Sequence, residues 1–131
     1  MKIYKELIIF GIGGNCIDIL DTANCINESQ GGDIYKCLGF LDDDEESWGK
    51  EIHGVKVLGA LDTAPNYGDC FFVNGIGSPF NFPRKADIIS KTRVPLDRFE
   101  TLIHPSAVVS KMSNIGAGTV LLQNVTIASD V

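Results

Sequence analysis

The chain has 131 residues, of which 44% are hydrophobic and 21% are charged, and its formal net charge is −6. This length suits one domain with a small appendage, and the composition is sufficient for an ordinary globular core. The acidic balance argues against a nucleic-acid groove or an anionic membrane surface, since both select basic stripes. It does not exclude a phosphate-bearing small molecule, because backbone amides bind phosphate without Lys or Arg.

The cysteines and the N-terminal sequence indicate a reducing compartment. No two cysteines have CxxC spacing, and the N-terminus lacks the long apolar region of a secretory signal. We therefore expect a cytoplasmic protein that has no disulfide framework, no metal site and no membrane-inserted segment. The thiols expected to be reduced are Cys16, Cys25, Cys37 and Cys70.

Short apolar runs that end at glycines or acids predict the strands of a parallel sheet. The first run covers residues 7–10, and helical spacing of apolar residues predicts a helix over 17–26, followed by a loop at 27–32. Strands that alternate with helices imply an α/β fold with right-handed crossovers. Further strands are expected at 34–41, 54–59, 70–77 and 100–103, and short helices at 60–66 and 82–91.

Polar and glycine-rich segments follow three of the predicted strands. They are the glycine turn at 11–15, the acidic run at 42–46 and the segment 74–77, which begins with Asn74 and Gly75. In a parallel α/β sheet, ligands bind beyond the carboxyl ends of the strands. We therefore expect the three segments to converge on one edge of the sheet and to form the binding site.

The glycine turn, "GIGGNC" at residues 11–16, leaves three interpretations open. A dinucleotide fingerprint requires glycine where Cys16 stands and an acidic residue about 20 positions further on, whereas Asp42 lies later than that. A nicotinamide or flavin site is therefore the weaker alternative, and a purely structural corner is another. The interpretation that we favour is a phosphate or pyrophosphate held by the amides at the N-terminus of the following helix.

The acidic run divides into two parts. Asp42 and Asp43 come directly after the second strand, where they could accept hydrogen bonds from a ribose or from a base edge. Asp44, Glu45 and Glu46 are expected to form a solvated face.

Neither histidine is assigned to catalysis. His53 stands among charged residues before a glycine, so we expect an exposed loop histidine. His104 precedes Pro105, which favours an extended conformation, and we expect it to shape a hinge into the C-terminal segment. No Ser-His-Asp or Cys-His constellation can be assembled from the sequence with any specificity. No catalytic residue is therefore assigned.

The C-terminal segment has a different period. Apolar residues recur every six positions at Val109, Ile115, Leu121 and Ile127, and "IGAGTV" has the hexapeptide pattern of a left-handed parallel β-helix. Three hexads make one coil of about 18 residues, and a solenoid is stable only when several coils stack. We expect residues 1–103 to form a Rossmann-like domain and 104–131 to be the first coil of a β-helix, in a chain that is a piece of a longer protein.

With these features in order, the sequence resembles the sugar O-/N-acetyltransferases of the sialic acid O-acetyltransferase type, which include the UDP-4-amino-sugar N-acetyltransferases of bacillosamine synthesis. The stretches that carry the resemblance are "LIIFGIGGN", "CLGFLDDD", "IHGVKVLG", "LIHPSAVVS" and "IGAGTVLLQNVTI". The resemblance implies a Rossmann-like domain that holds a nucleotide diphosphate sugar, with a UDP-sugar expected. It also implies a β-helix that forms a homotrimer and binds acetyl-CoA between subunits.

The resemblance also implies roles for single residues. The pyrophosphate would lie at Gly11, Gly13, Gly14 and Asn15, and the uracil end at Asp42 and Asp43. Family members usually have His where Asn15 stands, and Asn can donate a hydrogen bond to phosphate but brings no charge.

The family's catalytic histidine and most of its acetyl-CoA site are expected further along the β-helix. We therefore expect this chain to be the nucleotide-sugar-binding portion of an acetyl-CoA-dependent sugar acetyltransferase, without transfer activity or strong acetyl-CoA binding of its own. The alternative is a non-enzymatic nucleotide-sugar-binding module with a regulatory or scaffolding role.

Overall fold

The computed structural model describes residues 4–76, 90–110, 120–121 and 126–127. Its main element is a five-stranded sheet in the order β3-β4-β2-β1-β5, in which β4, β2, β1 and β5 pair in parallel and β3 is antiparallel to β4. This arrangement confirms the predicted α/β, Rossmann-like architecture. The strands are β1 (Lys5–Phe10), β2 (Tyr35–Leu41), β3 (Glu51–Ile52), β4 (Val55–Gly59) and β5 (Phe71–Asn74).

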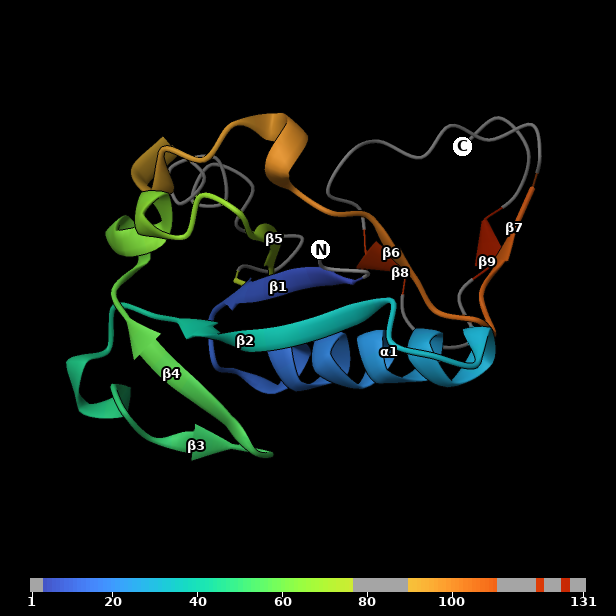
Figure 1. Ribbon diagram of the computed structural model, residues 1–131, viewed down its shortest axis with the longest axis horizontal. Coiled ribbons are helices and arrows are strands. Elements are labelled where there is room, and N and C mark those ends of the chain that lie inside the picture. The colour runs from blue at the N-terminus through green and yellow to red at the C-terminus, as the bar shows by residue number, and fades with distance from the viewer. Residues whose placement is uncertain (1–3, 77–89, 111–119, 122–125, 128–131) are drawn as a thin grey trace.

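Strand β1 lies inside the sheet and sends alternate side chains to its two faces. Leu7 and Ile9 join the core formed with helix α1 (Gly14–Gln30). Ile8 and Phe10 join the core on the other face, beneath the 3₁₀ helix η2 (Leu61–Asn66) and the segment that follows residue 90. Figure 1 shows α1 along one face of the sheet and these segments over the other. Burial on both faces explains why β1 is a continuous apolar run.

Helix α1 is longer than the sequence pattern predicts. It continues to Gln30, and Gly31 ends it with a φ of 70°, so the loop predicted from residue 27 is wrong over its first four positions. Asn27 stays helical because its amide joins the helix to β2: Nδ2 donates to Tyr35 O at 2.8 Å, and Oδ1 accepts from the N–H groups of Ile34 and Tyr35. No helix in the described part of the chain has both the length and the apolar character to cross a membrane.

The hairpin formed by β3 and β4 is an element that the apolar pattern does not predict. Strand β3 has two residues, which is too short to show a period of two. The turn consists of His53 and Gly54, with φ of 51° and 81°, as a two-residue hairpin turn with the right twist requires. The helix predicted at 60–66 is present as the 3₁₀ helix η2. Of the helix predicted at 82–91, residues 82–89 lie outside the described residues.

Four short strands follow, joined in two parallel pairs. Leu102 pairs with Val120 and Val108 with Thr126, so that each partner lies 18 residues further along the chain. Of the strand predicted at 100–103, residues 102–103 are extended and pair with residues 120–121, and Leu102 is fully buried in the core beside α1. Most of the predicted hexads lie outside the described residues. The strands are β6 (Leu102–Ile103), β7 (Val108–Val109), β8 (Val120–Leu121) and β9 (Thr126–Ile127).

Candidate functional site

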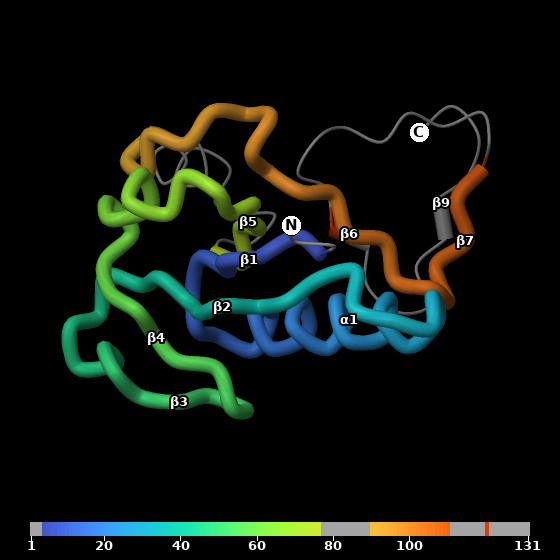
Figure 2. The backbone as a smooth tube through the Cα atoms, viewed as in Figure 1, coloured from blue at the N-terminus to red at the C-terminus, as the bar shows by residue number. Residues whose placement is uncertain are grey.

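The three predicted site segments meet at the carboxyl edge of the sheet. Phe10, the last residue of β1, stands beside Leu41 of β2 on one side and Asn74 of β5 on the other. The N–H of Gly11 donates to Leu41 O at 2.8 Å, and the N–H of Gly75 donates to Phe10 O at 2.9 Å. The strand order changes direction between β1 and β5 (Figure 2), which is the switch point where α/β sheets bind ligands. The predicted convergence is therefore confirmed.

One half of the glycine turn is tightly packed. Gly11 has a φ of 104°, and a Cβ at this position would lie 2.7 Å from Ile76 Cγ1 and 2.8 Å from Cys16 Sγ. A Cβ at Gly75 would lie 2.5 Å from the same sulfur. Both glycines are buried. They let the first turn of α1 approach the segment after β5, so the role that the structure gives them is close packing.

The other half of the turn is open. Gly13 and Gly14 are exposed, and a Cβ at either position would meet no atom within 4 Å. Gly13 is the N-cap of α1, no side chain caps the helix, and its first turn holds no acidic residue. Among the described residues, the N–H groups of Gly14 and Asn15 have no hydrogen-bond partner. The Asn15 amide donates to Gly75 O at 3.4 Å, which joins the turn to the β5 segment.

Asn74 carries an unpaired donor at the same edge. Its Oδ1 accepts from the N–H of Ile76 at 2.9 Å, which fixes the orientation of the amide. Its Nδ2 is buried and has no partner within the part of the chain that the structure describes. A buried donor without a partner costs about 1–3 kcal/mol, and a ligand oxygen would remove that cost.

The two predicted acids have different surroundings. Asp42 is half-buried, and its Oδ1 accepts from the N–H of Asp44 at 2.8 Å. Asp42 directly follows Leu41, whose carbonyl accepts from the N–H of Gly11, and this hydrogen bond places Asp42 next to the glycine turn. Burial raises the pKa of the Cys16 thiol to about 11, and the charge of Asp42 adds to this rise. Asp43 Oδ1 instead accepts from the N–H of Leu61 at 3.0 Å.

Asp43 is also engaged by a lysine. Its Oδ2 pairs with Lys91, and the hydrogen bond from this lysine holds the pKa of the Asp43 carboxyl below its usual value. Both oxygens of Asp43 thus have partners within the protein, whereas Asp42 stands beside the open turn. The rest of the run, Asp44, Glu45 and Glu46, is exposed as predicted.

Trp48 is a candidate that the sequence motifs miss. Its indole Nε1 donates to the backbone oxygen of Asp42 at 2.8 Å, and 41% of the residue is exposed. The ring is thereby held beside the acid at the site edge, where an aromatic face could stack on a base. The signal in the sequence is a single aromatic residue after an acidic run, which belongs to no recognisable motif.

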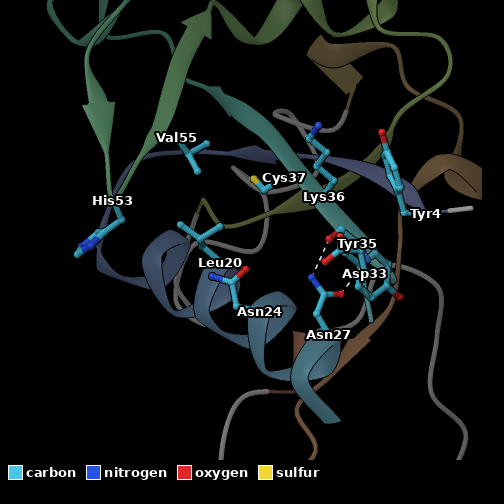
Figure 3. Close-up of a pocket in the computed structure, with 10 residues that line it drawn as sticks. All are labelled: Tyr4, Leu20, Asn24, Asn27, Asp33, Tyr35, Lys36, Cys37, His53 and Val55. Atoms are coloured by element: carbon cyan, nitrogen blue, oxygen red, sulfur yellow. Dashed lines mark hydrogen bonds between the residues drawn. The ribbon is translucent and has the colours of Figure 1, made fainter. Parts of the chain in front are cut away.

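Two cavities lie away from the switch point. One of about 410 Å³ is formed by α1, the start of β2 and the β3–β4 turn, at the amino edge of the sheet (Figure 3). The side-chain amide of Asn27, which lines this cavity, is already hydrogen-bonded to the backbone of Tyr35. His53 also lines the cavity and is exposed, as predicted. The other, of about 360 Å³, lies between η2, β5 and the segment 93–98. Arg98 at this cavity is held by Gly68 O.

Comparison with known proteins identifies a family. Residues 6–85 match the model of the PglD N-terminal domain. The acetyltransferase domain of PglB from Neisseria gonorrhoeae, in complex with acetyl coenzyme A, is similar at 20% identity and a TM-score of 0.70, over 94% of this chain and 55% of that chain. PerB from Caulobacter crescentus, in complex with CoA and GDP-perosamine, is similar at 23% identity and a TM-score of 0.70, over 95% and 55%. No curated protein matches the sequence.

The structural matches show a shared fold, and this chain spans about half the length of those proteins. The family match covers more than half of this chain, and it includes the glycine turn, both acids and the segment after β5. The family match and the structural matches both cover the predicted site segments. The chain therefore belongs to the family of the PglD N-terminal domain.

Proposed function

We propose that this chain is the nucleotide-sugar-binding portion of an acetyl-CoA-dependent sugar acetyltransferase. The observation that carries the proposal is the open first turn of α1, where the N–H groups of Gly14 and Asn15 are unpaired within the described residues and the turn itself contains no acidic residue. The N-terminus of a helix attracts anions through its dipole and its unpaired N–H groups. This arrangement supports a pyrophosphate as the group that binds there.

The neighbouring side chains suit the rest of a nucleotide sugar. Asn74 Nδ2 would donate to a ligand oxygen, and Asp42 would accept from the ribose or the base, with Trp48 stacked on that base. Asn74 is the last residue of β5, whereas Asp42 and Trp48 lie in the segment after β2, so the three side chains come from both sides of β1. The GDP-perosamine held by PerB supports a nucleotide sugar as the ligand class. We keep a UDP-sugar as the expected ligand.

The C-terminal strands support the proposed β-helix. Each parallel pair joins residues 18 positions apart, which equals three hexads and thus one coil. The boundary that we propose, with a domain at 1–103 and the first coil at 104–131, stays a prediction. Acetyl coenzyme A in the PglB structure and CoA in PerB support acetyl-CoA as the co-substrate of the longer protein. The homotrimer stays a prediction. We propose that this chain alone does not transfer acetyl groups.

Calorimetric titration tests the nucleotide-sugar site. The chain is titrated with a UDP-sugar, a GDP-sugar and NAD, and the UDP-sugar is expected to bind. A hydrogen bond to a charged group contributes about 1.5–3 kcal/mol, so Asp42→Ala should weaken binding about tenfold or more. Glu45→Ala, in the same acidic run but exposed, is the matched control and should bind as the wild type does. Binding of NAD without binding of any nucleotide sugar would overturn the proposal.

A further inference from the structure

Three metal-ligating side chains of different kinds gather outside the proposed nucleotide-sugar site. A carboxylate oxygen of Asp21, the sulfur of Cys25 and a ring nitrogen of His104 all lie within 4.8 Å of one another. Asp21 and Cys25 are four residues apart on α1, so they share one face of the helix. Figures 1 and 2 show the chain after β6, which carries His104, running beside the carboxyl half of α1.

This set of donors fits a divalent transition metal. Thiolate, imidazole and carboxylate are the three side-chain groups that bind Zn²⁺, whereas Mg²⁺ and Ca²⁺ select oxygen ligands alone. Ligand atoms at about 2.0–2.3 Å from a tetrahedral Zn²⁺ lie about 3.5 Å apart. Cys25 Sγ and Asp21 Oδ2 are 4.0 Å apart. Asp21 is exposed and Cys25 half-buried, so small rotations of two surface side chains would bring the donors to ligand distance.

The ring of His104 is oriented by Ser106. Its Nδ1 lies 3.0 Å from the backbone nitrogen of Ser106 and 2.9 Å from Ser106 Oγ. In one tautomer Nδ1 accepts from these two groups, and the proton is on Nε2. In the other tautomer Nδ1–H donates to Ser106 Oγ, and the lone pair of Nε2 is available to a metal. This tautomer loses the hydrogen bond from the backbone N–H of Ser106 to Nδ1. Metal-bound histidines commonly donate their second N–H to an oxygen in this way.

The charges around the thiol favour a cation. The carboxylates of Asp21 and Glu28, on the same helix as Cys25, put negative charge beside the thiol, and this charge would attract a divalent cation. His53, which could otherwise compete as a ligand, belongs to the β3–β4 turn and is not part of the cluster.

We propose that Asp21, Cys25 and His104 bind Zn²⁺ or a related divalent transition metal, with a water molecule as the fourth ligand. The metal would fasten α1 to the segment after β6, and so join the Rossmann-like domain to the chain that leaves it. The site lies at least one turn away from Gly14, where α1 begins. Metal binding and nucleotide-sugar binding should therefore be separable.

Titration of the reduced chain with Co²⁺ tests the site, because a tetrahedral Co²⁺ with a thiolate ligand gives charge-transfer and d–d absorption bands. One Co²⁺ is expected to bind per chain, to be displaced by Zn²⁺ and to be unaffected by Mg²⁺. Cys25→Ser and His104→Ala should each weaken binding at least tenfold, and Cys25→Ser should also remove the charge-transfer band.

Matched variants control this titration. Cys37→Ser and His53→Ala change the same residue types elsewhere, and Asp18→Asn changes an exposed acid one turn earlier on α1. All three should keep the wild-type bands. Zn²⁺ should also raise the thermal unfolding midpoint of the wild type and not that of Cys25→Ser, because a metal that binds the folded state stabilises it. Absence of a thiolate–cobalt band in the folded wild type would overturn the proposal, as would a band that persists in a folded Cys25→Ser.

Discussion

The packed and the open halves of the glycine turn answer two different physical needs. Gly11 and Gly75 are buried, and a side chain on either would collide with the first turn of α1 or with the segment after β5. Gly13 and Gly14 are exposed and would collide with nothing. The packed pair brings two strand ends together, whereas the open pair leaves helix amides accessible. A glycine-rich motif thus combines a structural and a binding requirement, which substitutions can separate.

The largest effect is expected at the packed half. A Cβ at Gly75 would lie 2.5 Å from Cys16 Sγ, 3.1 Å from Ile19 Cδ1 and 3.2 Å from Phe10 O, and the last of these is backbone that cannot rotate away. Overpacking of this kind costs about 1–3 kcal/mol. We expect Gly75→Ala to lower the free energy of unfolding by about 2–3 kcal/mol in urea denaturation. A variant as stable as the wild type would show that the turn and the β5 segment are not packed as described.

The open half should show the reverse pattern, with weaker binding and no loss of stability. Gly14 is the first residue of α1, so Gly14→Ala replaces a poor helix former and should change stability by no more than about 1 kcal/mol, in the favourable direction. A methyl group beside the free amides should weaken UDP-sugar binding about tenfold in calorimetry.

Gly32→Ala is the matched control, because a Cβ there also meets no atom within 4 Å. It should bind the UDP-sugar as the wild type does. Equal affinities of the Gly14→Ala and wild-type chains would contradict the proposed pyrophosphate position and leave the turn with a structural role alone.

Periodicity and burial explain what the sequence predicts. The parallel strands are visible because both faces of β1 are covered, which requires an apolar residue at every position. Because the strands are parallel, their carboxyl ends lie at one edge of the sheet, and the three segments that follow them meet there. Strand β3 is missed because two residues show no period. The hexads beyond residue 110 remain predictions where the structure does not describe them.

The roles of single residues could not be predicted because they depend on contacts between distant parts of the chain. Gly11 is packed by Ile76, and Asp43 is occupied by Leu61 and by Lys91. The absence of CxxC spacing predicts no metal site. The proposed site combines one face of α1 with His104, and such a cluster leaves no regular spacing in the sequence.

The two acids also have different roles, because both oxygens of Asp43 already have partners within the protein. Asp43 accepts the N–H of Leu61 at the start of η2, and a hydrogen bond of this kind contributes about 0.5–1.5 kcal/mol. We expect Asp43→Ala to lower the free energy of unfolding by about 1 kcal/mol and to change UDP-sugar affinity little. Asp42→Ala should weaken binding, and because it removes the hydrogen bond from the Asp44 N–H it should also lower the free energy of unfolding by about 1 kcal/mol. The two variants therefore differ in affinity, and a pair in which Asp43→Ala weakens binding and Asp42→Ala does not would assign the ligand to Asp43.

The smallest effect concerns how the free energy of unfolding changes with pH under acidic conditions. Because the hydrogen bond from Lys91 lowers the pKa of Asp43, this carboxylate stabilises the folded state above its usual pKa of 3.8, and the contribution is lost as pH falls through the lowered value. Both side chains are largely exposed, at 41% and 51%, so solvent screens the pair and the change in stability will be slight.

The protonation of Asp43 itself is the more direct measurement. We expect the titration midpoint of its carboxyl, followed by NMR, to lie below 3.8 in the wild type and to rise in Lys91→Met, because the donor that lowers it is removed. Lys50→Met, which removes an exposed lysine elsewhere, should leave the midpoint where it is in the wild type. A wild-type midpoint at 3.8, unaffected by Lys91→Met, would mean that Asp43 is free in solution. Its carboxylate would then be as available to a ligand as that of Asp42, and the proposed difference between the two acids would be wrong.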